Sequence, residues 1–266
     1  MINWRSFLFP YEQAVEELKI KFKSLRNEYR KKSIVSPIEF ITGRVKAVPS
    51  IIDKAQKMGY SESEIGEKME DIAGIRIMCQ FEDDIYKVVE LINRRDGIDM
   101  HVIQEKNYIK YKKDSGYRSY HMIIKYPVVT TEGTTELLAE IQIRTLSMNF
   151  WATIEHSLKY KYKENIPEKV AEKLLKTAEA AYMLDKEMLE IRDEVIAAQE
   201  LFMVKDNLMG RIMYYINMLD SMQKKDLALL YRIKLEKATE EADEIKRDIV
   251  LSNLGTELME LLEDNN

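Results

Sequence analysis

The chain has 266 residues, of which 33% are charged and only nine are Gly and five Pro, a composition that favours a helix-rich globular protein over a disordered one. Its net charge of −5 gives no overall attraction for nucleic acid. A single cysteine, Cys79, excludes an intrachain disulfide and a multi-cysteine zinc site, and we expect it to be a buried thiol. No apolar stretch reaches the roughly 20 residues of a membrane helix. The N-terminus has no secretory pattern, so we expect a cytoplasmic protein with no membrane association.

Charge is unevenly distributed along the chain. Residues 1–46 contain ten Lys and Arg against five Asp and Glu, whereas residues 203–266 contain nine against thirteen. A basic front and an acidic tail suit an anionic ligand that is bound by the front part of the chain.

The first predicted helix begins at Pro10, which is suited to a first helical position, and apolar residues recur every three or four positions up to Tyr29. Its other face is basic and is either a solvated face or an anion-binding surface. A second helix is expected from about Pro49 to Met58. The pattern Ser61-x-x-Glu64 is a capping box that predicts a short third helix.

Alternating apolar residues predict three strands, at residues 75–81, 121–126 and 137–144, with a helix at 83–95 and a turn at 130–134. In the last strand the apolar residues share one face, and Glu140, Gln142 and Arg144 share the other. That polar face either lines a cleft or faces solvent.

After Thr145 the chain reads as helical, with a long helix starting at Pro167 and amphipathic segments at 208–222 and 224–250. The predicted fold class is α+β, a mixed β-sheet flanked by helices with a helical C-terminal extension. We expect two parts, residues 1–202 and 203–266.

Three polar segments suggest nucleotide chemistry. Residues 112–121 combine a glycine, aromatic rings, cations and His121, so a purine could stack on Tyr117 while Lys113, Arg118 and His121 take phosphate or hydroxyl oxygens. Residues 71–76 place Asp71 before a strand and Arg76 on its polar face, which suits a metal and a nucleotide, or simply a cap and a surface arginine. Residues 42–46 add Arg44 and Lys46 after a glycine.

Together these segments resemble the RelA/SpoT-type alarmone synthetases, or GTP pyrophosphokinases, in their short synthetase-only branch. The resemblance covers roughly residues 1–202 and rests on five blocks in the family's order and spacing: residues 42–46, 71–76, 115–121, 140–145 and 150–156. It implies a nucleotidyltransferase-like core that acts in the stringent response, moving pyrophosphate from ATP to the 3′-hydroxyl of GDP or GTP. The products would be AMP and (p)ppGpp.

The resemblance also assigns roles to residues of this sequence. It implies ATP contacts at Arg44 and Arg76, around adenine, and at Lys46, Lys54 and Lys57, near the phosphates. It implies Mg²⁺ ligands at Asp71 and Glu140, and Glu140 is the candidate for the base that deprotonates the 3′-hydroxyl. For the acceptor nucleotide it implies guanine stacking on Tyr117, phosphate contacts from Lys113 and His121, and a cleft shaped by Gln142 and Arg144.

Assembly and regulation are further implications of the resemblance. Short synthetases of this kind form homotetramers, and one branch binds pppGpp in a cleft between subunits. The matching allosteric residues are Lys21, Lys23, Glu39, Phe40, Thr42 and Asn149. The unfamiliar segment 203–266 makes the geometry of a tetramer an open question.

Two alternatives to the enzyme remain at this stage. A degenerate synthetase could bind single-stranded RNA through basic residues interleaved with Tyr108, Tyr111, Tyr117 and Tyr120. A nucleotidyltransferase could also act on another acceptor. The intact acidic pair, Asp71 and Glu140, favours an enzyme over a pure binding module. With three histidines and no His-Asp dipeptide, the chain is expected to lack alarmone hydrolase activity. The preference among GMP, GDP and GTP is not predicted.

Overall fold

The structure is a computed structural model that describes residues 2–32, 34–161 and 167–263, apart from the side chains of 160, 161, 200–207 and 263. The chain divides into two compact units, residues 1–189 and 190–266. The domain boundary predicted after residue 202 falls in the same helix as this division and stays a prediction.

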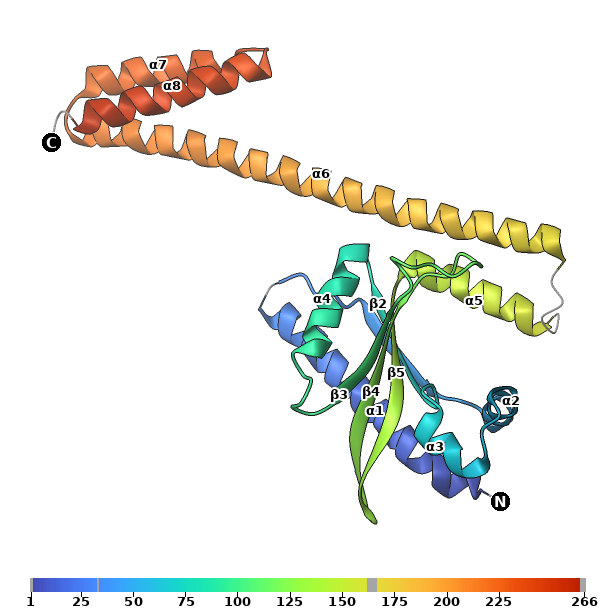
Figure 1. Cartoon of the computed structure of the whole chain (residues 1–266). Helices are drawn as coiled ribbons and strands as arrows, with labels where there is room; N and C mark the ends of the chain where they lie inside the picture. The colour runs from blue at the N-terminus through green and yellow to red at the C-terminus, as the bar shows by residue number, and fades with distance from the viewer. Residues whose placement is uncertain (1, 33, 162–166, 264–266) are drawn as a thin grey trace. The chain divides into compact units, whose positions relative to one another are not determined.

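The first unit is built on a five-stranded mixed sheet (Figure 1). The strands are β1 (Phe40–Val45), β2 (Ala73–Cys79), β3 (His101–Asn107), β4 (Tyr120–Thr130) and β5 (Gly133–Thr145). Their order across the sheet is β1-β2-β5-β4-β3, and only the β2–β5 pair is parallel. The predicted α+β class and mixed sheet are therefore confirmed.

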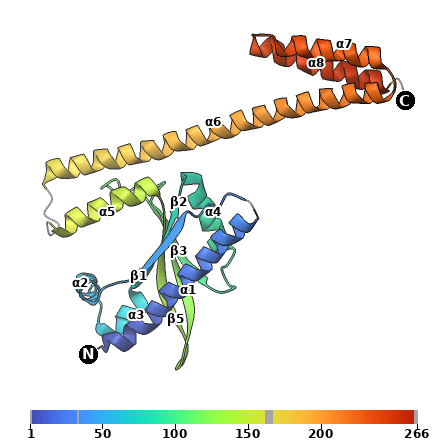
Figure 2. The ribbon, with the colours of Figure 1, turned by 180° about the vertical axis from the view of Figure 1, so that it is seen from behind.

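Helices accompany this sheet throughout the first unit. They are α1 (Trp4–Lys31), α2 (Val48–Met58), a 3₁₀ turn (Glu62–Glu64), α3 (Ile65–Lys68), α4 (Glu82–Asn93), α5 (Leu146–Lys161) and the start of α6 (Glu168–Ser221). Helix α1 crosses one face of the sheet (Figure 2), where Leu18 and Phe22 are buried in one core with Ile75 and Ile141. Cys79 is buried in the same core, as predicted.

Local signals explain where several helices begin and end. The predicted capping box is confirmed, since the Ser61 backbone N–H donates to Glu64 at 2.9 Å. Helix α2 starts with a proline in its first turn and ends at Gly59, whose φ of 70° closes the helix in the left-handed region. The prediction that Pro10 opens the first helix is wrong. Asn3 caps α1, and Pro10 lies inside the helix.

Two strands were missed by periodicity. β1 contains Gly43, and a Cβ at that position would lie 2.8 Å from Val15 of α1. Close packing against the helix therefore requires a glycine where an apolar side chain would otherwise mark the inner face of the strand. β3 is an edge strand whose side chains are mostly exposed. His101, the first residue of this strand, is exposed.

The second unit is a small helical assembly of the end of α6, α7 (Lys225–Thr239) and α8 (Glu244–Glu263). It has its own core, in which Ile216, Leu235 and Leu258 are buried. The amphipathic segment predicted at 224–250 is divided between α7 and α8 at residues 240–243.

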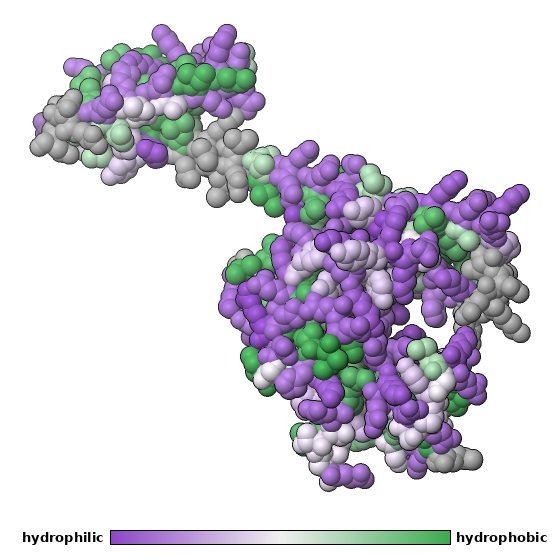
Figure 3. Space-filling view, in the orientation of Figure 1, coloured by the Kyte–Doolittle hydropathy of each residue, from purple (hydrophilic) through white to green (hydrophobic). Residues whose placement is uncertain are grey.

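In the view of Figure 3 the surface is largely hydrophilic, as expected from the charged fraction of 33%. Among the described residues, no helix combines the length and apolar character needed to span a bilayer.

Candidate active site

One polar row crosses the sheet on the face opposite α1. The strand register places Thr42 beside Arg76, Arg76 beside Gln142, Gln142 beside His121 and His121 beside Lys106. Arg76, Gln142 and His121 alternate with apolar neighbours that are buried in the core beneath α1, so the row lies on the other face of the sheet. The predicted polar face of β5 is therefore continuous with polar residues of β1, β2 and β4.

A cleft of about 240 Å³ opens on this face. We call it the sheet cleft; it is lined by Thr42, Gly43, Arg44, Lys46, Asp71, Gly74, Ile75, Arg76, Glu140 and Gln142. Asp71 lies just before β2, and Glu140 pairs in register with Gly74 near the start of that strand. The parallel pairing of β2 with β5 thus brings together two carboxylates that are 69 residues apart.

Two lysines converge on Asp71. Lys46 Nζ lies 2.7 Å from Oδ2, and Lys54 Nζ, which comes from α2, lies 2.8 Å from Oδ1. Burial raises the pKa of Asp71, but the hydrogen bonds and charges of these lysines outweigh burial and hold the pKa below its ordinary value. Asp71 is therefore an ionised carboxylate at neutral pH.

Glu140 has a protein partner at each oxygen. His121 Nδ1 lies 2.8 Å from Oε1, and Gln142 Nε2 donates to Oε2 at 2.7 Å. Burial raises the pKa of Glu140. The contact with His121 and the amide of Gln142 together lower it by more than burial raises it, so the pKa lies below its ordinary value. The negative charge of Asp71 acts in the opposite direction, which shows that the two carboxylates interact electrostatically.

Three arginines give the site a cationic wall. Burial lowers the pKa of Arg76, and the charges of Arg144 and Arg44 lower it further. Cations that repel one another in a partly buried site are stabilised by an anionic ligand or by the face of an aromatic ring. The wall therefore suits phosphate groups and a purine base.

Five side chains form a closed ring of hydrogen bonds beside the sheet cleft. The Tyr117 hydroxyl lies 2.7 Å from His121 Nε2 and accepts from Arg144 at 2.6 Å. Arg144 also donates to Gln142 Oε1 at 2.6 Å, and Gln142 and His121 both contact Glu140. Tyr117 and Glu140 are thus held in one network, and both ring nitrogens of His121, predicted to contact acceptor phosphates, have protein partners.

We call the segment 108–119 the acceptor loop, because it contains Lys113 and Tyr117, which are predicted to contact the acceptor nucleotide. Contacts with α6 fix this loop. Arg118 is buried, donates to Glu179 at 3.0 Å and stacks on Tyr182. The prediction that Arg118 takes phosphate oxygens is therefore wrong, because its guanidinium anchors the loop. A Cβ added to Gly116, whose φ is 84°, would lie 2.6 Å from Ala178, so the loop approaches the helix closely.

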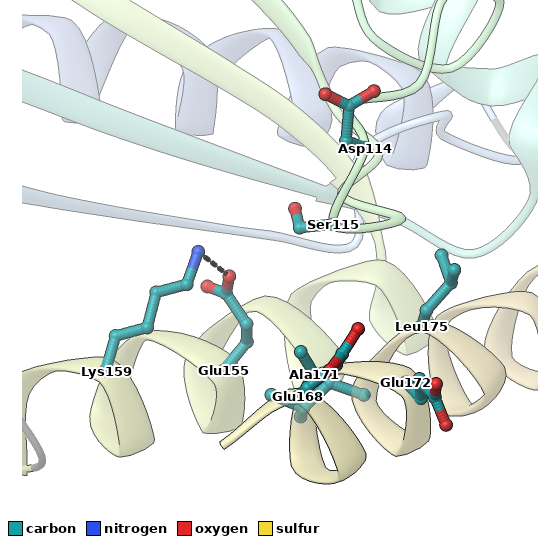
Figure 4. Close-up of a pocket in the computed structure, with 9 residues that line it drawn as sticks. Asp114, Ser115, Glu155, Lys159, Glu168, Ala171, Glu172 and Leu175 are labelled. Atoms are coloured by element: carbon teal, nitrogen blue, oxygen red, sulfur yellow. Dashed lines mark ion pairs between the residues drawn. The ribbon is translucent and has the colours of Figure 1, made fainter. Parts of the chain in front are cut away.

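A second pocket, of about 420 Å³, lies between the acceptor loop, α5 and α6 (Figure 4). Among the described residues, its lining includes the carboxylates of Asp114, Glu155, Glu168 and Glu172 and a single lysine, Lys159, which forms an ion pair with Glu155. Four carboxylates against one ammonium repel phosphate groups. The described lining of the sheet cleft therefore suits nucleotide phosphates better, although this cleft has the smaller volume.

Among the remaining predicted residues, which are Lys57 and the allosteric set, Thr42 lines the sheet cleft and the others are not part of its described lining. Lys57 is exposed on α2 near Asp53. Of the allosteric set, Lys21 pairs with Asp99 and Phe40 is exposed on β1. The others are Lys23, which is exposed on α1, Glu39, which accepts from Gln80, and Asn149, whose buried Oδ1 has no hydrogen-bond partner in the described part of the chain. A cleft between subunits would be built from several chains, so this site stays a prediction.

Sequence reasoning missed two residues that support the acceptor loop. Glu179 holds Lys112 and Arg118, and Tyr108 contacts Lys113, Tyr117 and His121. The helical pattern of α6 gave no reason to single out Glu179. Tyr108 was noted only for its place among basic residues.

Comparison with known proteins agrees with this site. A family profile described as "Region found in RelA / SpoT proteins" matches residues 43–165. The chain is 56% identical over 200 residues to the GTP pyrophosphokinase YjbM of Bacillus subtilis, covering 75% of this chain and 93% of that protein. A quarter of this chain thus lies outside the match.

Two solved structures are similar at comparable identity. The small alarmone synthetase 1 of Bacillus subtilis bound to its product pppGpp has a TM-score of 0.69 and 56% identity, covering 72% of this chain and 97% of that one. The same synthetase bound to AMPCPP has a TM-score of 0.64 and 52% identity, covering 73% and 98%. The chain therefore belongs to the RelA/SpoT family, in its branch of small alarmone synthetases.

Proposed function

We propose that the protein synthesises (p)ppGpp by transferring pyrophosphate from ATP to the 3′-hydroxyl of GDP or GTP, with release of AMP. The observation that carries the proposal is that Asp71 and Glu140 line the same cleft as Arg44 and Arg76. Two solved structures of one relative support it, since the small alarmone synthetase 1 of Bacillus subtilis is bound to pppGpp in one and to AMPCPP, an analogue of ATP, in the other. Transfer of this kind needs positioning and charge neutralisation more than covalent chemistry by the protein.

The donor nucleotide is assigned to the β1–β2 side of the cleft. Arg44 and Arg76 line that side and can place flat guanidinium groups against adenine. Lys46 and Lys54 are the nearest ammonium groups to Asp71 and are assigned to the phosphates of ATP. Lys57 stays a weaker candidate on α2, because it is exposed and does not line the cleft.

The carboxylates fit a magnesium ion. Mg²⁺ takes oxygen ligands and is commonly held by one or two carboxylates together with substrate phosphates and water. Asp71 and Glu140 would hold it, since both are ionised, lie in the same cleft and repel one another in the absence of a cation. When bound, the ion neutralises charge that develops on the phosphates.

The acceptor is assigned to the β4–β5 side. Tyr117 presents an aromatic ring for guanine, and Lys113 lies beside it for the 5′-phosphates. Glu140 is the candidate base for the 3′-hydroxyl, because it is ionised and lies on β5 beside His121. His121 is bonded to Glu140 and Tyr117, so we assign it first to their positioning and only then to a phosphate contact.

The proposal includes the setting in which the enzyme works. We propose a cytoplasmic homotetramer without hydrolase activity, in which pppGpp binds between subunits at the allosteric residues named above. Binding of single-stranded RNA is less favoured, because Tyr120, one of its four proposed rings, is buried.

One experiment tests the activity directly. Purified protein is mixed with Mg²⁺, ATP and each of GMP, GDP and GTP, and the products are separated by ion-exchange chromatography. We expect AMP together with a guanosine that carries a new 3′-diphosphate. Binding of nucleotides without AMP release would favour the binding module, and transfer to another position would favour a different nucleotidyltransferase.

A further inference from the structure

An ammonium group lies between two tyrosine rings in the acceptor loop. Lys113 Nζ lies 4.6 Å from the centroid of the Tyr108 ring and 5.1 Å from that of Tyr117. Both distances are within the range of a cation–π contact. Lys113 is exposed, so without these rings its four-carbon side chain would sample many rotamers.

Tyr108 also contacts the other acceptor residues. Its ring meets Tyr117 edge to face at a centroid distance of 6.0 Å and His121 at 5.1 Å with an interplanar angle of 85°. Aromatic pairs favour these edge-to-face arrangements, which hold rings at fixed angles. A single side chain therefore touches the predicted stacking ring, the predicted phosphate ligand and the histidine that holds Glu140.

The local backbone fixes Tyr108 in this place. The Tyr108 N–H donates to Ser119 O at 3.0 Å, which ties the two ends of the acceptor loop together. Asn107 Oδ1 accepts from the N–H groups of Ile109 at 3.0 Å and Lys110 at 2.9 Å, and Ile109 is buried. Tyr108 thus stands on an ordered turn that directly follows β3.

We propose that Tyr108 is a positioning residue for the acceptor nucleotide, which orients the Lys113 ammonium toward the 5′-phosphates and sets the affinity for GDP and GTP. The inference rests on the proposed function for the assignment of the acceptor to this side. Tyr108 acts through Lys113 and Tyr117, and the donor nucleotide, assigned to β1 and β2, is bound without its help.

The test replaces Tyr108 with Leu and with Phe. Affinity for guanosine, GDP and GTP is measured by isothermal titration calorimetry, and KM and kcat are measured separately for donor and acceptor. A cation–π contact at an exposed site corresponds to a factor of about two to five in an equilibrium constant. We expect Tyr108→Leu to weaken GDP and GTP by about that factor, to leave KM for ATP unchanged and to affect guanosine less. Tyr108→Phe should restore the affinity, since the ring is retained.

Tyr111→Leu is the matched control. Tyr111 lies in the same loop, and its ring contacts the Lys110 ammonium. The residue is 68% exposed, and its ring contacts none of Tyr108, Tyr117 and His121 among the described interactions. The same substitution there should leave acceptor affinity unchanged. Thermal unfolding of all variants identifies any general loss of structure.

A double-mutant cycle with Lys113→Met tests the coupling. In the Lys113→Met background, Tyr108→Leu should weaken GDP binding less than it does in the wild-type protein, because only the contribution through Tyr117 is left to lose. The inference is overturned if Tyr108→Leu leaves GDP affinity unchanged, or if its effect is equal in both backgrounds. Because binding is measured without turnover, a protein that binds GDP through Tyr108 but releases no AMP would sink the proposed synthetase and leave this inference standing.

Discussion

His121 and Glu140 lie on neighbouring antiparallel strands, and Nδ1 of the imidazole is 2.8 Å from Oε1 of the carboxylate. Gln142 occupies the second oxygen of Glu140 at 2.7 Å. The carboxylate is therefore fixed before any substrate arrives, while each of its oxygens keeps a second lone pair that could take a metal ion or a proton. Fixing a reactive group in advance is how a rigid scaffold lowers the cost of reaching the transition state.

Replacement of Glu140 by Gln should remove the proton acceptor and one ligand of the proposed metal site. General base catalysis contributes about 10²- to 10⁴-fold, so we expect kcat for AMP release to fall at least into that range. Binding of GDP should persist, because Gln is nearly isosteric and the acceptor is held by other residues. Stopped reactions analysed by ion-exchange chromatography give the rate, and calorimetry gives the affinity.

Glu136→Gln is the control for this substitution. Glu136 lies on the same strand, four residues earlier, and is exposed. Its replacement should leave kcat within a factor of about two, as expected for an exposed residue away from the site. Equal turnover of Glu140→Gln and the wild-type protein would remove Glu140 from the mechanism.

Strand alternation correctly predicted the two faces of β5. It placed Glu140, Gln142 and Arg144 on the face away from the core, because a two-residue period fixes the faces of any strand. It could not identify His121 as the partner of Glu140. That contact depends on the register of β4 against β5, which is set by the hairpin at 130–133 and by packing on the core.

Periodicity failed where tertiary contact decides the structure. β1 has Gly43 where an apolar residue would mark its inner face, and the space is filled by Val15 and Lys19 of α1. The roles of Tyr108 and Glu179 depend on contacts between segments that are distant in sequence, and no local sequence pattern predicts such contacts. Arg118 was interpreted as a ligand of phosphate because a cation beside glycine and tyrosine cannot be distinguished, by sequence alone, from a buried anchor.

Gly116→Ala should disturb the acceptor loop. The substitution forces a non-glycine residue to a φ of 84° and brings its Cβ to 2.6 Å from Ala178. Strain of this kind costs about 1–3 kcal/mol, so the loop should shift away from α6. We expect a higher KM for GDP with little change in KM for ATP, together with a lower midpoint of thermal unfolding.

Two further variants separate strain from collision. At Gly59 the φ is 70° but no atom lies within 4 Å of an added Cβ, so Gly59→Ala carries the strain alone and should not change KM for GDP. Combining Gly116→Ala with Ala178→Gly removes the closest contact of the added Cβ, leaving Leu175 at 3.0 Å, and should restore part of the acceptor affinity. A double variant no better than Gly116→Ala would show that the helix contact does not matter.

Asp185→Asn should change stability in a pH-dependent way. Burial raises the pKa of Asp185, and hydrogen bonds from Ser147 and Thr145 offset only part of this, although Thr145 Oγ1 lies 2.6 Å away. A carboxyl with a raised pKa in the folded state binds more protons when folded, so its contribution to stability is lost as pH rises above the unfolded value of about 3.9.

Asparagine has no charge to lose, and it keeps an oxygen that can accept from Thr145. Relative to wild type, Asp185→Asn should therefore gain stability as pH is raised from about 4 to 7. Urea unfolding at several pH values, with the free energy of unfolding extrapolated to water, measures the trend. A difference that stays constant, or that changes in the opposite direction, would contradict the assignment of a raised pKa.

Ile216→Asp should unfold the C-terminal unit and spare the synthetase site. Ile216 is fully buried in the core of that unit, and a carboxylate there has no partner to replace its hydration, a defect expected to cost several kcal/mol. The named residues of the sheet cleft all lie in the first unit, whose core is separate.

Limited proteolysis with mass spectrometry should give cleavage after residue 190 in Ile216→Asp while AMP release is retained. Met213→Asp, on the same helix but 43% exposed, should stay resistant. Loss of AMP release in Ile216→Asp alone would mean that catalysis requires the folded C-terminal unit.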